Sequence, residues 1–189
     1  MAEDTNTMVV KRTIEVTPAL MWEAWTTPGQ VVKWWGPSGF TSTIEEMDVR
    51  PGGLWKLTMH GPDGRDYPNK ATYEEVKKPE KIVFRQHESR ELDLAEWRQE
   101  ISFDAVGAHT TVTMISRFPS SEEMAKHLEK FSALEGAQQT LERLSEHLDK
   151  LAQAAETNQH QPVQETLRRQ EPAFREQLDE KDHGDSAQL

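Results

Sequence analysis

Residues 16–37 read VTPALMWEAWTTPGQVVKWWGP and predict two short helices that follow a strand. The threonine before Pro18 is typical of a helix N-cap, and proline suits the first helical position because no backbone N–H is needed there. Pro28 opens a second helix, and a Gly-Pro pair ends it. We therefore expect helices at 18–26 and 28–35, each with tryptophans on its apolar side.

The chain on both sides of this stretch alternates apolar and polar residues in the manner of β-strands. One strand precedes it at 8–16, and six follow it. The six are expected at 40–49, 54–60, 70–77, 82–87, 97–103 and 110–118. A serine N-cap at 120 or 121 then starts a long helix whose apolar residues recur every three or four positions as far as Leu148. The predicted fold class is α+β, with a curved antiparallel sheet of about six to seven strands wrapped around a long C-terminal helix.

A change in composition after Leu151 predicts the end of the folded domain. Apolar residues thin out there, and the remaining stretch is polar and rich in glutamine. Four apolar anchors of any size remain, which are Val163, Leu167, Phe174 and Leu178. They are too few to offset the entropy lost in ordering about forty residues. We expect one domain at 1–151 and a disordered tail at 152–189.

Charge and composition exclude several classes of protein. The chain has a formal net charge of -11, which repels the phosphates of nucleic acids. It has no cysteine, so disulfides, thiol nucleophiles and cysteine-based zinc sites are absent, as is usual in the cytoplasm. No window approaches the roughly 20 apolar residues of a membrane span. We predict a cytoplasmic protein with no nucleic-acid partner and no membrane span, and no sequence pattern fixes the oligomeric state.

Three collinear motifs carry a resemblance to a known family. They are the helical stretch at 16–37, DVRPGGLW at 48–55, and GPDG at 61–64 followed by YEEV at 73–76 and PEKIVF at 79–84. Over about 8–148 the chain resembles the START-like SRPBCC superfamily, in the branch named after the activator of the heat-shock chaperone ATPase. The resemblance implies a helix-grip fold with an apolar cavity between the sheet and the long helix. At Ala137 the chain departs from relatives that commonly carry tryptophan, and this small residue implies a larger pocket.

A set of aromatic, methionine and aliphatic residues forms the candidate lining of that cavity. Strand alternation places Trp55, Leu57 and Met59 on one face, and Trp97 and Ile101 on one face of a later strand. One helix stripe does not fill a strongly curved sheet, so part of this set is expected to face a pocket and the rest to be core. The candidate ligand-binding residues are Trp34, Phe40, Trp55, Leu57, Met59, Phe84, Trp97, Ile101, Met114, Phe131 and Leu134.

Acidic residues at 45–48, together with His60 and His87, suggest acid–base or metal chemistry at first sight. Their spacing matches no metal motif, and strand alternation sends Glu45 and Glu46 to opposite faces. Solvated strand charges explain them better, with a buried pair of Glu46 and Arg50 as the alternative. We therefore expect no catalytic residue, no metal and no cofactor.

Three functions remain open at this stage. The first is a non-enzymatic module that binds a small apolar or amphipathic ligand. The alternative is a chaperone-cofactor-like or other protein-interaction module with a protein partner, active in the stress response. The third is an enzyme like the cyclases and dehydrases of the wider superfamily. A dry pocket favours the first, a collapsed pocket with an exposed apolar patch the second, and converging polar groups the third.

Overall fold

The computed structural model describes residues 5–179, with side chains as far as residue 158. Strand β1 (Thr7–Ile14) leads into helices α1 (Pro18–Thr26) and α2 (Pro28–Trp34). Six strands follow, which are β2 (Thr41–Met47), β3 (Leu54–His60), β4 (Asp66–Lys77), β5 (Lys81–Gln86), β6 (Trp97–Val106) and β7 (His109–Arg117). Helices α3 (Ser121–Phe131) and α4 (Ala133–Asp179) come last. The predicted order of elements is confirmed.

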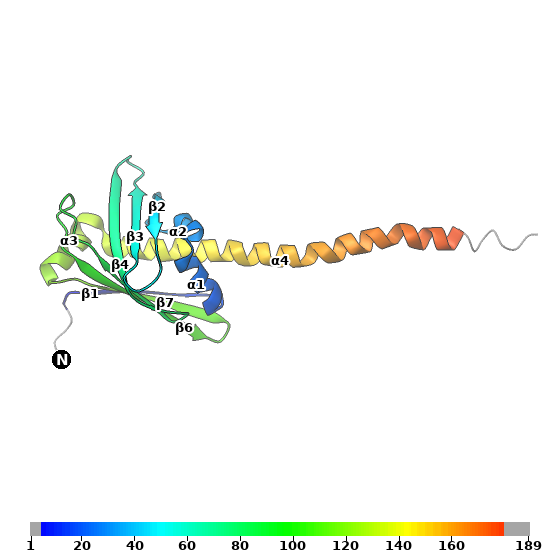
Figure 1. Ribbon diagram of the computed structural model, residues 1–189, viewed down its shortest axis with the longest axis horizontal. Helices are drawn as coiled ribbons and strands as arrows, with labels where there is room; N and C mark the ends of the chain where they lie inside the picture. The colour runs from blue at the N-terminus through cyan, green and yellow to red at the C-terminus, as the bar shows by residue number, and fades with distance from the viewer. Residues whose placement is uncertain (1–4, 180–189) are drawn as a thin grey trace, which may run out of the picture. The chain divides into compact units, whose positions relative to one another are not determined.

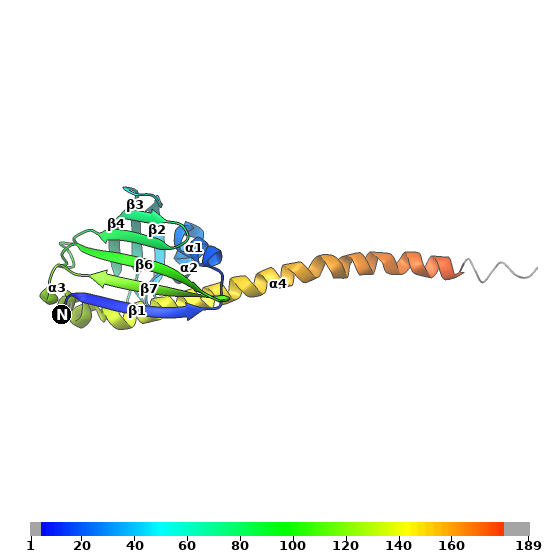
Figure 2. The same cartoon turned by 90° about the horizontal axis from the view of Figure 1, so that it is seen from below.

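All seven strands form one antiparallel sheet in the order β1-β7-β6-β5-β4-β3-β2. The predicted α+β fold class is therefore confirmed. Register shifts lie in β2 between Ile44 and Glu46 and in β4 between Tyr73 and Glu75. Such bulges bend a strand and increase its twist, which accounts for the curvature visible in Figures 1 and 2. Both views place α3 at one end of the sheet and α1 and α2 towards the other.

The helix starts follow from the residues that precede them. The hydroxyl of Thr17 accepts a hydrogen bond from the Leu20 amide at 3.3 Å, and Pro18 opens α1. The hydroxyl of Ser120 accepts from the Glu123 amide at 3.1 Å and so caps α3. Each cap satisfies an amide that the first turn of a helix leaves unpaired. Both predicted N-termini are confirmed.

The single long helix expected after residue 120 is divided at Ser132, so this detail of the prediction is wrong. Ser132 has φ 49° and ψ 46°, a left-handed conformation that ends α3, and α4 begins at the next residue. The apolar stripe of α4 still packs on the sheet, as predicted. Its members Leu141, Leu144 and Leu148 are at most 1% exposed.

We call the part of the inner sheet face that packs against α1, α2 and the buried stripe of α4 (Leu141, Leu144 and Leu148) the closed end. Trp34 is completely buried, lies 4.7 Å from the ring of Trp25, and donates from Nε1 to the Ala24 carbonyl at 3.1 Å. Trp35 continues the cluster to Trp55 on β3, with ring centroids 4.8 Å apart. Aromatic side chains of two helices and the sheet therefore fill this end of the fold.

Arg143 on α4 ties the loop after α2 to the closed end. Its Nη1 donates to the carbonyls of Gly36 at 2.8 Å, Pro37 at 3.1 Å and Trp35 at 3.4 Å. Partial burial lowers the pKa of this guanidinium from its usual value. These three carbonyls lie just after α2 and outside regular secondary structure. The guanidinium supplies the hydrogen-bond donor that a helix or sheet would otherwise provide.

The chain divides into two compact units, Met1–Asp149 and Lys150–Leu189. Helix α4 begins in the first unit and is continuous to Asp179 in the second. The predicted domain limit at residue 151 and the disorder of 152–189 stay predictions, and residues 180–189 lie outside the described residues. No described helix is both long enough and apolar enough to cross a membrane.

Candidate ligand-binding cavity

A cavity of about 560 Å³ lies at the other end of the inner face, which we call the open end. It is found where β3 and β5 end, where β4 and β6 begin, and beside the last turns of α3. Its apolar walls come from Leu57, Met59, Tyr67, Leu92, Leu94, Trp97 and Phe131. Residues from distant parts of the chain meet here because, in an antiparallel sheet, the end of one strand lies beside the start of the next.

Strand alternation and helix periodicity explain which side chains line the cavity. Leu57 and Met59 are two residues apart on β3 and share one face of the sheet. His127 and Phe131 are four residues apart on α3 and share one face of that helix. Trp97 is the first residue of β6, and its ring lies beneath α3 at 5.5 Å from the ring of His127. The walls therefore combine one sheet face with one helix face.

His127 is enclosed by aromatic rings. Its ring centroid lies 4.5 Å from that of Phe118, 5.5 Å from that of Trp97 and 6.3 Å from that of Phe131. The residue is 7% exposed, and its buried Nε2 has no hydrogen-bond partner. Burial lowers the pKa of this imidazole below 6.5, outweighing the nearby carboxylate of Glu123. Burial therefore favours the neutral form of His127.

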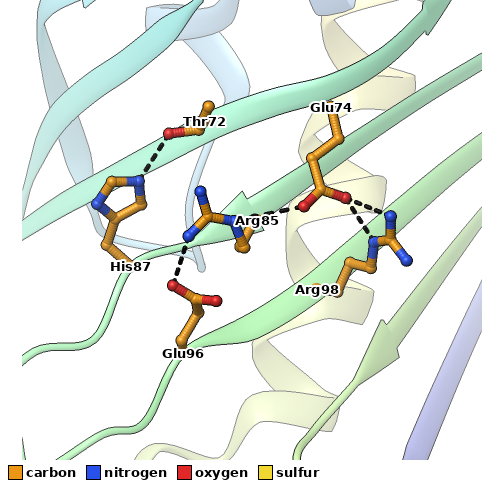
Figure 3. Close-up of polar contacts among 6 residues, drawn as sticks. All are labelled: Thr72, Glu74, Arg85, His87, Glu96 and Arg98. Carbon is orange, nitrogen blue, oxygen red and sulfur yellow. Dashed lines mark hydrogen bonds and ion pairs between the residues drawn. The ribbon is translucent and has the colours of Figure 1, made fainter. Parts of the chain in front are cut away.

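Polar side chains occupy the opposite wall. The Asn69 side chain donates to the Tyr67 carbonyl at 2.8 Å and accepts from Gln86 Nε2 at 3.3 Å. His87 borders the cavity at the end of β5, but its Nε2 is paired at 2.7 Å with the hydroxyl of Thr72, which shares the outer face of β4 with Glu74 (Figure 3). The inner wall thus presents the amide groups of Asn69 and Gln86.

The connection between β5 and β6 forms a strap, residues 88–95, at the edge of the cavity. Two backbone hydrogen bonds of 2.9 Å join Ser89 and Leu94, and Leu92 turns inward with 8% exposure. The Leu92 carbonyl accepts from Lys130 Nζ at 3.1 Å, which ties the strap to α3.

A second tie runs from the strap to Glu123 at the start of α3. The Ala95 amide donates to Glu123 Oε2 at 3.2 Å, while Lys126 donates to Oε1 at 2.8 Å. Lys126 also lies 3.5 Å from Asp93 of the strap. The hydrogen bond from Lys126, followed by that from Ala95, lowers the pKa of the Glu123 carboxyl. Strap and helix are therefore held together by polar contacts near the surface.

The outer face of the same strands is charged and self-paired. Figure 3 shows Glu74 between two arginines, with Arg85 at 3.4 Å and Arg98 Nε donating at 2.6 Å. Arg85 also donates to Glu96 at 2.6 Å. These exposed pairs alternate along the strands with buried residues of the inner face. The outer face is therefore solvated, and the site lies on the inner one.

Comparison with known proteins identifies the family. Residues 15–149 match the family model described as Activator of Hsp90 ATPase homolog 1-like protein. The chain belongs to this family. No curated protein matches it. Among solved structures it is similar to a protein from Arthrobacter aurescens, at 22% identity and TM-score 0.72 over 79% of this chain and 90% of that one.

Two further solved structures show the same fold. A protein from Mycobacterium smegmatis has 25% identity and TM-score 0.68, over 75% of this chain and 90% of that one. The AHSA1 protein from Silicibacter pomeroyi has 20% identity and TM-score 0.62, over 76% of this chain and 97% of that one. The likeness covers 90% to 97% of each of these relatives.

The structure distributes the sequence-predicted ligand residues of this Activator of Hsp90 ATPase homolog 1-like domain over three places. Four of them line the cavity, which are Leu57, Met59, Trp97 and Phe131. Five are at most 5% exposed in the core, which are Trp34, Trp55, Phe84, Ile101 and Met114. The remaining two do not line the cavity. Phe40 lies 5.8 Å from the ring of Tyr67, and Leu134 is 42% exposed on α4.

Sequence reasoning missed His127 and the inward residues of the strap. The signal for His127 was its position four residues before Phe131 on a helix with one buried face. The signal for Leu92 and Leu94 was a pair of apolar residues two apart in an otherwise polar connection. Ala137 does not line the cavity, because α3 covers that end of the sheet in place of α4. Its small side chain therefore does not enlarge the pocket.

The acidic residues near β2 are placed differently from the alternatives considered above. Glu46 pairs with Lys56 at 3.3 Å, and Arg50 donates to Asp48 at 2.7 Å, so the buried pair of Glu46 and Arg50 is wrong. The bulge at Glu45 interrupts the alternation that was expected to separate it from Glu46. Across the described residues, no three His, Cys, Asp or Glu side chains are grouped to hold a metal.

Proposed function

We propose that the chain binds a small, neutral, amphipathic molecule in the cavity at the open end. The observation that carries this proposal is an apolar cavity of about 560 Å³ with polar groups confined to separate parts of its wall. Rings of Trp97 and Phe131 offer flat apolar contact, and the amides of Asn69 and Gln86 offer hydrogen bonds on the other side. A few polar groups in an apolar pocket are typical of sites for small molecules.

The charges around the cavity favour a ligand without net charge. Its lining includes three cationic and three anionic side chains, which are Lys56, Lys70, Arg90, Glu45, Glu88 and Glu91. All of these are exposed or half-buried, whereas Leu57 and Leu92 of the lining are buried. An ionised ligand would lose hydration without gaining an opposite charge inside. A neutral molecule avoids that loss.

The lining supports binding over hydrolytic catalysis. Of the two histidines in it, His87 is occupied by Thr72, and His127 is buried among rings. Among the described residues, no carboxylate forms a hydrogen bond that orients either histidine. A nucleophile activated by a histidine needs such an arrangement. The cyclase- or dehydrase-like alternative therefore finds less support than ligand binding.

A neutral fluorescent probe tests the proposal. N-phenyl-1-naphthylamine is expected to bind at one site and to quench Trp97, because burying its surface contributes roughly 25 cal/mol per Å². Leu94→Trp fills part of the cavity and should weaken the probe at least fivefold. Leu134→Trp, at an exposed position on α4, is the matched control and should leave affinity unchanged. Lack of saturable binding by the wild-type chain, or equal weakening in both variants, would contradict the proposal.

A protein-interaction function is the second candidate, and the family description favours it. An Activator of Hsp90 ATPase homolog 1-like domain suggests a chaperone partner and a role in the stress response. The test is the ATPase rate of Hsp90 purified from the same host, measured with and without this chain. Stimulation by a chain that binds no apolar probe would favour the partner over the ligand.

A further inference from the structure

The buried Nε2 of His127 lacks a hydrogen-bond partner at the wall of the cavity. Buried polar atoms are nearly always paired, because an unpaired one loses its hydration without compensation. The residue is 7% exposed and Nε2 itself is buried, so a partner from solvent or from the cavity reaches this atom only where a neighbouring ring moves. The described residues include no protein group that completes this atom.

The protein groups nearest to His127 are engaged elsewhere. Glu123 and Lys126 on the same helix bind each other at 2.8 Å, and Lys130 donates to the Leu92 carbonyl. On the sheet side Trp97 and Phe118 present rings to the imidazole. No described side chain is therefore seen to complete Nε2.

Two of the three rings around His127 also line the cavity. Phe118 is 3% exposed and closes the sheet side, whereas Trp97 and Phe131 are half-buried and both line the cavity. The ring of Phe131 is the more distant of these from His127, at 6.3 Å. A ligand seated in the cavity would therefore lie beside the rings of Trp97 and Phe131 that enclose His127.

We infer that His127 Nε2 is a subsite for the hydroxyl group of an aromatic or alicyclic alcohol, and this inference rests on the proposed function. One nitrogen of a neutral imidazole donates and the other accepts, and a hydroxyl group completes Nε2 in either tautomer. A ligand carbonyl can only accept, so it pairs with Nε2 only in the tautomer in which Nε2 carries the proton. A carboxylate would bring a charge into a wall made of rings. Flat ligand rings suit the edge-to-face contacts that Trp97 and Phe131 offer.

His87 provides an internal contrast. It also borders the cavity, but its Nε2 is paired at 2.7 Å with the Thr72 hydroxyl on the outer face of β4 (Figure 3). A ligand hydroxyl gains nothing there that the protein does not already supply. The two histidines therefore form a matched pair for a substitution experiment.

The experiment compares 2-naphthol with 2-methylnaphthalene, which replaces the hydroxyl by a methyl group of similar size. Affinities are measured for the full wild-type chain, His127→Phe and His87→Phe. The ratio of naphthol affinity to methylnaphthalene affinity is expected to fall about tenfold in His127→Phe, because one hydrogen bond is lost. It should be unchanged in His87→Phe. Comparing ratios between variants cancels the different hydration of the two ligands.

The outcomes separate this inference from the function on which it rests. If both ligands bind and the ratio does not change in His127→Phe, the hydroxyl subsite is wrong while ligand binding stands. If neither ligand binds the wild-type chain, the proposed function fails with it.

A spectroscopic measurement on the wild-type chain covers the case in which His127→Phe does not fold. The ¹⁵N resonance of His127 Nε2 should shift with 2-naphthol and not with 2-methylnaphthalene. Equal shifts with the two ligands would overturn the inference.

Discussion

The closed and open ends share the same strands but differ in what covers them. Strand β3 contributes Trp55 to the closed end and Met59 to the open end, and β6 contributes Phe103 and Trp97 in the same way. Two tryptophan-bearing helices and the stripe of α4 fill the closed end. One short helix and a polar-tied strap cover the open end. The covering elements, and not the sheet, therefore decide which part is core and which part is cavity.

The largest expected effect compares truncations at the two ends. Trp34→Ala should lower the free energy of unfolding by about 4 kcal/mol, because it empties a fully buried site. Phe131→Ala should cost only about 1 kcal/mol, because the ring is half-buried and borders existing space. Denaturant unfolding measures both. Equal losses would show that the open end is packed as tightly as the closed end.

Removal of the Arg143 contacts should have the next largest effect. Arg143→Met keeps the aliphatic stem and leaves three carbonyls without their donor, at a cost of about 2 kcal/mol. Arg143→Lys retains the charge but not the forked geometry, so it should recover part of the loss. Thermal and denaturant unfolding check this order. If Arg143→Met and the wild-type chain have the same free energy of unfolding, water satisfies the three carbonyls as well as the arginine does.

Substitution of Glu123 should loosen the strap and change the free energy of unfolding of the whole domain only slightly. Glu123→Ala removes contacts to Ala95 and Lys126 near the surface, where ion pairs contribute less than about 1 kcal/mol. Hydrogen exchange at the Ala95 amide should accelerate while exchange in β6 stays slow. Glu122→Ala, in the same first turn of α3, is the control for the helix dipole. An unchanged exchange rate at the Ala95 amide would show that the backbone hydrogen bonds of the strap hold it in place without Glu123.

The smallest expected effect is a change in pH dependence at the open end. The pKa of His127 is lowered by burial, so below about pH 6.5 the unfolded chain binds a proton that the folded chain does not. Stability should therefore fall as the pH decreases from 7 to 5. His127→Phe should reduce this loss, measured as the difference in unfolding free energy between the two pH values. Part of the loss should remain, because burial also lowers the pKa of His87. An identical pH profile for variant and wild type would show that His127 is solvated.

Local patterns in the sequence predicted the elements well and the position of the cavity poorly. The hydroxyls of Thr17 and Ser120 accept hydrogen bonds from amides only three residues away. The alternation of buried residues in β3 likewise depends on one strand alone. The face of Trp55, Leu57 and Met59 was therefore predictable. Whether each of these residues is core or wall depends on which helix passes over it, and that is a property of distant segments.

Two local events with distant consequences explain most of the error. The left-handed conformation of Ser132 separates α3 from α4, although the apolar spacing continues across it. The inward turn of Leu92 depends on Lys130 and Glu123, far along the chain, for its fixation. The break at Ser132 leaves no periodic signal, and the spacing of Leu92 and Leu94 does not show which distant segments hold the strap, so the cavity could not be placed from the pattern alone.

The break at Ser132 has a consequence for how such a protein changes over generations. Because the cover of the cavity and the wall of the core are separate helices, substitutions accumulate in one without altering the register of the other. A substitution in α3 or the strap can therefore alter the wall of the cavity while the side chains of α4 that pack on the sheet keep their positions. One serine in an uncommon backbone conformation thus separates the two roles along the chain.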